Sequence, residues 1–288
     1  MKEIVIISGK GGTGKTVITA SIAALAKNKV MGDCDVDASN LYLLLHPEIK
    51  EKHEFYAGII PSIDLEKCTN CGRCQEVCRF DAIKTIKGQT VIDLVSCEGC
   101  GLCALVCPVK AIQMKENHCG EWYISETKYG PLVHARLGIA EENSGKLVTL
   151  VRQNAQAIAK KNNLELIIAD GPPGIGCPLI ATLSGANLAV VVTEPTLSGL
   201  HDLQRVIKVA QHFGVKTVVI INKYDINIEN SSKIEDWCQK DNIPIIGKIH
   251  FDNIITEALV KGLPVVEYSD NTAAKEIKGI WQSLKEML

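Results

Sequence analysis

Eight of the twelve cysteines fall into two runs with the same spacing. In each run, three cysteines at two-residue spacing can bind three irons of one cubane, whereas the fourth lies too far along the chain and binds the other cluster. The spacing therefore predicts two [4Fe-4S] clusters. The expected ligands are Cys68, Cys71, Cys74 and Cys107 for cluster 1, and Cys97, Cys100, Cys103 and Cys78 for cluster 2.

Zinc and disulfide bonds are the alternative uses of clustered cysteines. Zinc sites use two Cys-x-x-Cys pairs with a longer spacer, so the third and fourth cysteines of each run would be surplus. Disulfide bonds are typical of secreted chains. Here only four apolar residues follow Met1-Lys2-Glu3, which predicts no signal peptide. Iron–sulfur ligation is therefore favoured.

The two cysteine runs also indicate an internal duplication. Residues 68–83 end in Asp-Ala-Ile, and residues 97–112 end in Lys-Ala-Ile. Paired runs of this kind are typical of bacterial ferredoxins. We therefore predict a small α+β bacterial-type ferredoxin domain over residues 63–118.

A glycine-rich stretch from Gly9 to Thr16 lies between an apolar run and a helical pattern that begins at Val17. Glycines let backbone N–H groups turn inward around an anion, and the helix N-terminus adds partial positive charge. A lysine followed by a hydroxyl suits a nucleoside triphosphate, because the ammonium reaches the phosphates and the hydroxyl binds Mg²⁺. The expected nucleotide-binding residues are Gly11, Gly12, Thr13, Gly14, Lys15 and Thr16.

The same glycines, taken as Gly-x-Gly-x-x-Gly, also fit a dinucleotide-binding turn. Asp33 or Asp35 would then lie about 20 residues downstream and bind the ribose. Lys15 and Thr16 favour the triphosphate, because a dinucleotide turn uses neither of them.

The stretch Lys10-Gly-Gly-Thr-Gly-Lys15-Thr16 resembles the deviant P-loop of the MinD, Mrp and nitrogenase iron protein superfamily. The resemblance implies that Lys10 crosses a dimer interface to the phosphates bound by the other subunit. It thus implies an ATP-dependent homodimer with Lys10 and Lys15 as catalytic residues. A solvated loop lysine is the simpler alternative for Lys10.

Three acids, Asp33, Asp35 and Asp37, follow the second predicted strand and would repel one another without a nearby cation. In the superfamily resembled, this is the switch I segment, whose aspartate positions the attacking water. Asp35 matches that catalytic residue best, and Asp33 and Asp37 are alternates. A solvated acidic turn is the simpler alternative.

Asp170 ends a buried strand predicted at 164–169 and precedes Gly-Pro-Pro-Gly, which resembles the superfamily's switch II. An acid at the carboxyl end of a parallel strand beside the P-loop strand has the Walker B placement and holds Mg²⁺, usually through water. The expected Mg²⁺ residues are Thr16, Asp35 and Asp170.

Asn222 follows a later apolar strand and begins the sequence Asn-Lys-Tyr-Asp. The resemblance implies that its amide binds the adenine edge, since an amide offers a donor and an acceptor together. The four residues also fit the Asn-Lys-x-Asp guanine motif of GTPases. The rest of the resemblance favours ATP, with ADP as the product.

Cys177 lies seven residues after Asp170, which is the offset of a cluster ligand in the nitrogenase iron protein. The resemblance implies that two copies of Cys177 could bridge a further cluster between subunits. Cys119 is the nearby candidate for a second ligand. A plain thiol is the simpler alternative for Cys177.

Composition excludes several classes of function. A chain of 288 residues with 46% hydrophobic residues and a formal net charge of −2 is expected to be soluble and cytoplasmic, with no nucleic-acid partner. No apolar run approaches the roughly 18 residues of a membrane span. The mixed charges of the final helix, which aligns Ile277, Ile280, Trp281 and Leu284, favour packing on the core over membrane binding.

Together these features predict an α/β fold, a P-loop NTPase with a mostly parallel sheet and helices on both faces. Residues 1–62 and 119–288 form this domain, and the ferredoxin domain is inserted between its two switch segments. Gly-Pro and Ser-Gly steps within residues 130–146 predict a loop at the domain junction.

The favoured function is an ATP-gated electron-transfer protein with two clusters and a redox protein partner that the sequence does not identify. An iron–sulfur scaffold or carrier of the Mrp type is an alternative, although the late chain offers only Cys238 for a labile site. A MinD-like positioning ATPase with structural clusters is the third hypothesis.

Overall fold

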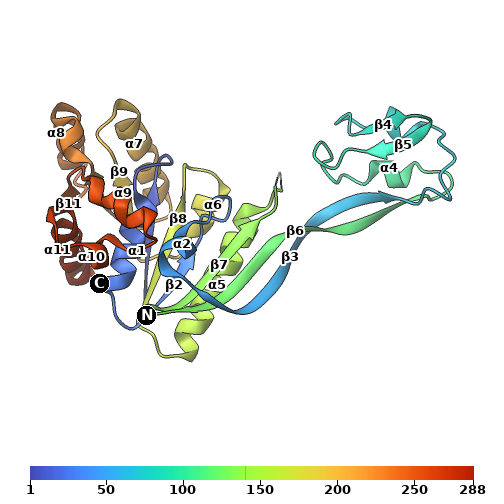
Figure 1. The fold of residues 1–288 in the computed structure, drawn as a ribbon. Helices are drawn as coiled ribbons and strands as arrows, with labels where there is room; N and C mark the ends of the chain where they lie inside the picture. Colours follow the sequence, from blue (N-terminus) through green and yellow to red (C-terminus); the bar gives the residue numbers. More distant parts are fainter. Residues whose placement is uncertain (140) are drawn as a thin grey trace. The chain divides into compact units, whose positions relative to one another are not determined.

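The computed structural model describes residues 1–139 and 141–288 (Figure 1). The chain folds into two compact units. The first unit comprises residues 1–53, 122–136 and 144–288, and the second comprises residues 54–121 and 137–143. The cysteine-rich segment therefore lies wholly within the second unit.

Within the described residues, one sheet has nine strands in the order β11-β10-β9-β1-β8-β2-β7-β6-β3. Its strands are β1 (Lys2–Ser8), β2 (Lys29–Asp33), β3 (Glu48–Ile63), β6 (Ile112–Thr127), β7 (Gly130–Leu137), β8 (Leu166–Pro173), β9 (Leu188–Thr193), β10 (Lys216–Asn222) and β11 (Ile245–Ile249). Every neighbouring pair from β11 to β7 is parallel. The prediction of a mostly parallel sheet is confirmed.

The predicted loop over residues 130–146 is wrong for its first half, where β7 runs beside β2. Pro131 is the second residue of this strand, close to the strand start, where a missing N–H is tolerated. Leu132, Val133 and Ala135 are then fully buried. A two-residue turn joins β6 to β7, and only antiparallel strands can be joined so tightly. Residue 140 of the predicted loop lies outside the described residues.

Helices cover both faces of the parallel strands (Figure 1). One face carries α1, which contacts α2, α10 and α11. The other face carries two pairs of helices in contact, α5 with α6 and α7 with α8. The helices of this unit are α1 (Lys15–Leu25), α2 (Leu41–Leu45), α5 (Ser144–Lys161), α6 (Cys177–Leu183), α7 (Leu197–His212), the 3₁₀ turn η1 (Tyr224–Ile226), α8 (Ile228–Lys240), α9 (Asn253–Val260), α10 (Val265–Tyr268) and α11 (Thr272–Met287).

The sheet core follows from strands that are apolar on both faces. In β1, Ile4 and Ile6 pack in the cluster that contains α1 and α11, while Val5 and Ile7 are equally buried on the opposite face. Continuous apolar runs are typical of parallel strands covered on both sides. The four apolar residues of α11 are also buried, which confirms that this helix packs on the core.

His134 of β7 is a buried titratable group in the first unit. Its ring stacks on Tyr123 with the centroids 4.9 Å apart and lies 6.2 Å from the ring of Tyr42. The Ser125 hydroxyl lies 3.0 Å from Nε2. Burial lowers the pKa of His134 to about 4, so the ring is neutral at pH 7.

Acid is expected to destabilise the first unit through His134. In the unfolded chain His134 has an ordinary pKa near 6.5 and is protonated below that pH. In the folded chain the ring stays neutral until the pH falls to about 4. Stability is therefore lost as the pH falls through this window, by up to about 3 kcal/mol. Urea denaturation at pH 7 and pH 4.5 should show a smaller loss for His134→Gln than for the wild type. Equal losses in the two proteins would contradict this assignment.

The second unit contains the hairpin strands β4 (Ile83–Ile86) and β5 (Gln89–Ile92) and the short helices α3 (Arg73–Glu76) and α4 (Leu102–Leu105). Its two halves repeat at an offset of 29 residues, and left-handed backbone recurs at equivalent positions. The paired positions with positive φ are Asn70 and Gly99, Gly72 and Gly101, and Asp81 and Lys110. The same backbone is thus formed twice, as an internal duplication requires.

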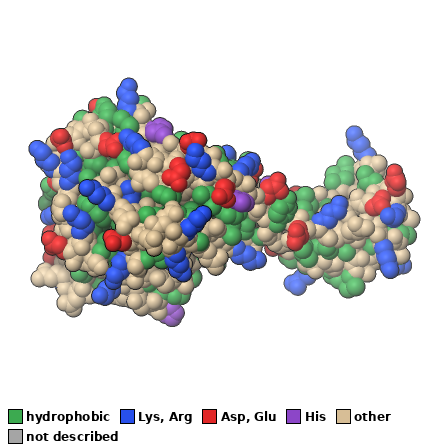
Figure 2. Space-filling model, turned by 90° about the horizontal axis from the view of Figure 1, so that it is seen from below, with side chains coloured by type: hydrophobic (Ala, Val, Ile, Leu, Met, Phe, Trp, Pro, Cys, Tyr) green, Lys and Arg blue, Asp and Glu red, His purple; other side chains and the backbone are tan. Residues whose placement is uncertain are grey.

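Charged side chains of both signs are interspersed on the face of the molecule that Figure 2 presents. Among the described residues, no helix combines the length and the apolarity needed to cross a bilayer.

Candidate functional site

The glycine-rich loop joins β1 to α1 and ends in a left-handed turn. Gly14 has φ +87° and precedes Lys15, the first residue of α1. A Cβ on Gly14 would lie 2.3 Å from Nδ2 of Asn222. That amide donates to the Thr13 carbonyl over 2.8 Å and is buried. Asn222 therefore holds the loop closed, and glycine is needed at 14 for both conformation and space.

Gly14→Ala is expected to destabilise the protein more than Gly12→Ala does. Gly14 has φ +87° and Gly12 has φ +80°, so backbone strain destabilises both variants by roughly 1–3 kcal/mol. At Gly12 nothing lies within 4 Å of the added Cβ, whereas at Gly14 the Asn222 amide must move and its hydrogen bond to Thr13 is lost. That bond adds about 1 kcal/mol to the difference. Urea denaturation without nucleotide measures it, and equal midpoints for the two variants would contradict this account.

Lys15 lies among carboxylates at the carboxyl ends of the central strands. Its Nζ is 3.0 Å from Asp170 Oδ1 and 3.5 Å from Asp35 Oδ2. The hydroxyls of Thr16 and Thr19 each donate to Asp170 over 2.7 Å. Carboxylate and hydroxyl oxygens are the ligands that Mg²⁺ prefers. The structure thus brings together Thr16, Asp35 and Asp170, the three residues expected to hold Mg²⁺.

Lys15 neutralises this acidic cluster. Burial alone would lower the pKa of Lys15, but Asp170, Asp35 and Asp33 together raise it above its ordinary value. Burial raises the pKa of Asp35, and Lys15 opposes that rise. Lys15 is only 6% exposed, so its charge is balanced by these carboxylates and not by water.

The three acids after β2 have different surroundings. Asp35 pairs with Lys15, whereas Asp37 is exposed. Asp33 is fully buried and accepts hydrogen bonds from the Ser39 hydroxyl and the Leu41 backbone N–H, 2.6 and 3.1 Å away. Burial raises the pKa of Asp33 to about 7. Asp33 therefore anchors the start of α2, and Asp35 is the acid placed to act on a bound nucleotide.

Lys10 is held by its own chain. Its Nζ lies 2.7 Å from Glu194 Oε1 and donates to the hydroxyls of Thr196 and Ser198, each 3.2 Å away. Lys223 reaches the other oxygen of Glu194 at 3.3 Å. Burial would raise the pKa of Glu194, but the two lysines hold it below its ordinary range. In the described structure Lys10 is therefore partnered within its own chain, although its side chain is partly exposed.

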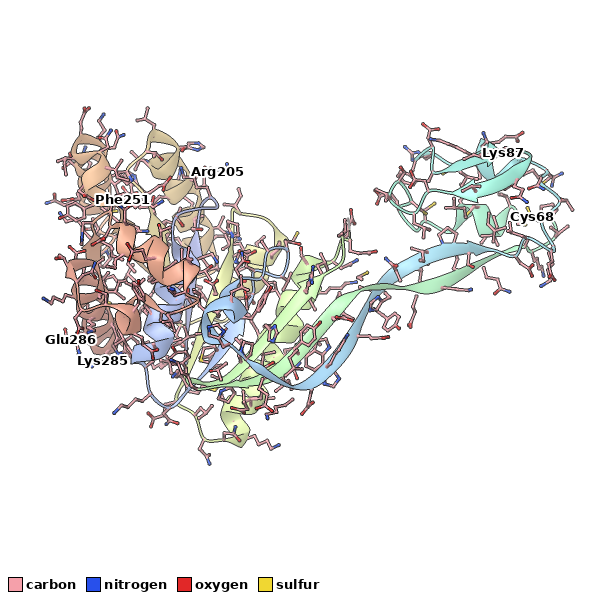
Figure 3. All side chains as sticks on the ribbon, viewed as in Figure 1. Cys68, Lys87, Arg205, Phe251, Lys285 and Glu286 are labelled. Carbon is pink, nitrogen blue, oxygen red and sulfur yellow. The ribbon has the colours of Figure 1, made fainter. Side chains whose placement is uncertain are left out.

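A hollow of about 680 Å³ opens beside the glycine-rich loop. Gly12, Gly14 and Asn222 line it from the loop side, and Phe251 (Figure 3) and Leu259 line it from the region around α9. Its walls are mostly apolar, as suits a flat heterocyclic base. Asn222 reaches the hollow, although its amide already binds Thr13 and the Lys223 N–H.

Two further hollows, of about 330 and 340 Å³, lie in the second unit. The four cysteines that line the first cysteine hollow are Cys68, Cys71, Cys74 and Cys107. The four that line the second cysteine hollow are Cys97, Cys100, Cys103 and Cys78. Each hollow thus takes three cysteines from one run and the fourth from the other, which is the grouping that the spacing predicts.

Among the described residues, no group of three or more His, Cys, Asp or Glu is arranged to hold a single metal ion. A cubane differs from a single ion, because the cluster itself fills the space between its four thiolates. A hollow edged by four cysteines has the four-thiolate donor set that such a cluster needs. Burial raises the pKa of Cys74 and of Cys103, so ligation would have to remove their protons.

The remaining cysteines lie outside the two hollows. Cys177 is exposed and begins α6. Cys119 is buried in the second unit, and its thiol donates to the Ala57 carbonyl over 3.1 Å. Cys34 and Cys238 are fully buried. An additional cluster on Cys177, with Cys119 as the candidate second ligand, stays a prediction.

Two residues at the nucleotide site were missed from the sequence. Thr19 lies one helical turn after Thr16 on the same face of α1, so helical spacing could have identified it. Glu194 is distant in sequence and reaches Lys10 only because β9 lies beside β1. No feature of the sequence predicted that Glu194 lies beside Lys10.

Comparisons with known proteins agree with this geometry. Residues 4–265 match the model of the CbiA family, described as the CobQ/CobB/MinD/ParA nucleotide binding domain. The chain is 36% identical to the uncharacterized protein MJ0578 of Methanocaldococcus jannaschii, over 99% of this chain and 97% of that protein. It is 28% identical to an iron-sulfur cluster carrier protein of Pyrococcus horikoshii, over 50% of this chain and 53% of that protein. Its fold resembles the cell division ATPase MinD of Pyrococcus furiosus, with a TM-score of 0.60, 20% identity, and coverage of 100% of this chain and 99% of that chain.

Proposed function

Because the chain belongs to the CobQ/CobB/MinD/ParA nucleotide-binding family, we propose that it is an ATP-hydrolysing iron–sulfur protein. In this proposal a nucleotide-dependent switch controls electron transfer through two [4Fe-4S] clusters. The observation that carries it is the lining of the two cysteine hollows, each edged by four cysteines drawn from both runs. When bound, the clusters supply one-electron redox chemistry.

The nucleotide part of the proposal is supported by the groups around Asp170. Thr16 and Asp170 are placed to hold Mg²⁺, and Lys15 is placed to turn from Asp170 to the phosphates. Asp35, released from Lys15 by that turn, can orient the attacking water. Each of these groups lies at the carboxyl end of a parallel strand or at the start of α1, where nucleotides bind in such sheets.

ATP is favoured over GTP by the surroundings of Asp225. In a guanine-binding motif this carboxylate must face the base. Here its Oδ1 accepts the backbone N–H of Phe251 over 2.6 Å. An oxygen used by the backbone is less free to bind guanine, and Asn222 alone suits an adenine edge.

The chain connects the nucleotide site to the second unit by a short route. Asp35 is followed by α2, and β3, which enters the second unit, begins three residues after α2 ends. The returning strand β6 neighbours β7, and β7 lies beside β2, where Asp33 is the register partner of His134. A nucleotide-driven shift after β2 would therefore act on the strands that carry the cysteine unit.

A homodimer follows from the role that we assign to Lys10. In the described chain Glu194 holds this lysine. We propose that ATP bound by a second copy attracts Lys10 away from Glu194, so that nucleotide draws two chains together. The redox protein that exchanges electrons with the dimer is unidentified.

The decisive experiment is anaerobic purification followed by ATPase and dimerisation assays with the clusters oxidised and reduced. We expect a brown protein that binds Mg·ATP and whose ATPase rate or dimerisation changes on reduction by dithionite. A colourless preparation that holds zinc, or a brown protein indifferent to adenine nucleotides, would overturn the proposal. Unchanged rates on reduction would favour structural clusters.

A second candidate is delivery of iron–sulfur clusters, which the similarity to a cluster carrier over half of the chain favours. The late cysteine that such a site would need, Cys238, is fully buried in α8, which weighs against it. Incubation with an iron chelator and an apo-ferredoxin separates the two candidates. A carrier gives up its iron rapidly to the acceptor, whereas an electron-transfer protein keeps it.

A further inference from the structure

The 29-residue repeat in the second unit allows the two cysteine hollows to be compared position by position. Arg73 lines the first hollow, and its counterpart in the second hollow is Leu102. Thr69 lines the first hollow, and its counterpart is Glu98. The first hollow therefore has an exposed arginine at its edge where the second has a leucine, and the second has an exposed glutamate where the first has a threonine.

The two hollows also differ in the hydrogen bonds that their cysteine sulfurs accept, and again the first hollow has the additional donor. In the first hollow the backbone N–H of Ala111 donates to Cys107 Sγ over 3.2 Å. Its counterpart would run from Ala82 to Cys78, and no such bond forms among the described residues. Lys67, next to Cys68, is paired with Asp64 at 2.7 Å and so adds little net charge near the first hollow.

The potential of an iron–sulfur cluster depends on nearby charge, on hydrogen bonds to its sulfurs and on exposure. Reduction adds a negative charge, which a guanidinium and an N–H donor stabilise and a carboxylate opposes. Resting on the proposed function, we propose that the centre in the first hollow has the higher reduction potential, set by Arg73, and that Glu98 holds the second centre lower. At equilibrium a single electron that enters the second unit therefore reduces the centre in the first hollow.

The electron step needs no bond to form or break. An external one-electron reductant, dithionite in the test below, is oxidised as one centre is reduced. If the second centre is reduced first, it is reoxidised as the first centre gains the electron. The direction follows from the residues at the two hollows and from the hydrogen bond to Cys107.

The test exchanges each charged residue for its counterpart in the other half. Holoprotein, Arg73→Leu and Glu98→Thr are titrated anaerobically with dithionite and redox mediators, and the reduced centres are followed by electron paramagnetic resonance. The wild type should show two reduction steps. Arg73→Leu should lower only the upper step, and Glu98→Thr should raise only the lower step. Each change should alter the reduced-to-oxidised ratio at a fixed potential by roughly fivefold, the effect of an exposed charge pair.

Lys87→Asn is the matched control, because it also removes one positive charge from the second unit. Lys87 lies in the turn between β4 and β5 (Figure 3) and lines neither hollow. Its φ of +51° is one that asparagine tolerates. The potentials of both reduction steps should stay at their wild-type values in this variant.

Iron content, measured before each titration, separates the possible failures. A wild-type chain that binds no iron overturns the proposed function itself. Full iron with one common step, a lower step that responds to Arg73→Leu, or an equal shift in Lys87→Asn overturns only the assignment of potentials. If Arg73→Leu binds less iron, Arg73→Gln is titrated in its place, because it removes the same charge with a smaller change of shape. An unchanged upper step in Arg73→Gln would then overturn the assignment to Arg73.

Discussion

Replacing Cys107 with alanine is expected to remove the cluster from the first hollow, although Cys107 belongs by sequence to the second run. It lines that hollow together with Cys68, Cys71 and Cys74, and a cubane that lacks one of four thiolate ligands is poorly held. Iron should fall from about eight to about four per chain, because each cluster contains four irons. Iron and sulfide analysis of anaerobically purified protein measures this loss.

The grouping of the ligands is tested by which redox step disappears. Cys107→Ala and Cys68→Ala should abolish the same reduction step, and Cys78→Ala and Cys97→Ala should abolish the other. Cys177→Ala is the control, because this exposed cysteine lines neither hollow, and its iron content should stay at that of the wild type. If Cys107→Ala and Cys97→Ala removed the same step, each run would ligate its own cluster and the exchange of fourth cysteines would be wrong.

The grouping of the first three cysteines of each run was predictable because local backbone determines it. In both halves a glycine with positive φ, Gly72 or Gly101, starts a single helical turn that carries the third cysteine, Cys74 or Cys103. The spacing of the run fixes this turn, and the duplication repeats it. The glycine-rich loop was predictable for the same reason, since Lys15 and Thr16 begin the helix that follows the loop.

Strand order was not predictable, and with it the partners of Lys10. Glu194 ends up beside this lysine because β9 is the neighbour of β1, a pairing between segments more than 180 residues apart. Alternating burial could not reveal it, because strands buried on both faces have no alternating pattern. The role of Asp33 was hidden likewise, because its partners Ser39 and Leu41 depend on how the chain turns into α2.

The limits of the second unit could not be inferred from composition either. The composition changes near Pro61, but β3 continues unbroken from Glu48 to Ile63 and contributes residues to both units. The segment 137–143 joins the second unit although it is distant from the cysteine runs. The backbone N–H of Gly138 donates to the Cys119 carbonyl over 2.7 Å, a long-range contact with no sequence signal.

Lys15→Met is expected to abolish ATP hydrolysis and also to destabilise the protein without nucleotide. Lys15 and Asp170 are 6% and 1% exposed, so removing the ammonium leaves a buried carboxylate without its counter-charge. Breaking one partner of such a pair costs about 3–5 kcal/mol. Urea denaturation at pH 8 measures the loss, and an exposed lysine beyond the far end of α1, Lys27, gives the control variant Lys27→Met, which should keep the stability of the wild type.

The loss in Lys15→Met should depend on pH, and the sign follows from the acidic cluster. Burial already raises the pKa of Asp33 to about 7 and raises that of Asp35, and without Lys15 both pKa values rise further. A carboxyl whose pKa is raised in the fold contributes stability at low pH and loses it as the pH rises through the folded pKa. As the pH rises above about 7, where Asp33 ionises in the wild type, the variant should therefore become progressively less stable relative to the wild type.

The double variant Lys15→Met with Asp170→Asn separates the two roles of the lysine. It removes the unpaired charge together with its partner, and a neutral amide can accept from one threonine hydroxyl through Oδ1 and donate to the other through Nδ2, so much of the lost stability should return. ATP hydrolysis should stay absent, because no cation reaches the phosphates and the Mg²⁺ carboxylate is gone. A single variant as stable as the wild type at pH 8, or a double variant less stable than the single one, would show that Lys15 does not balance Asp170 in the folded chain.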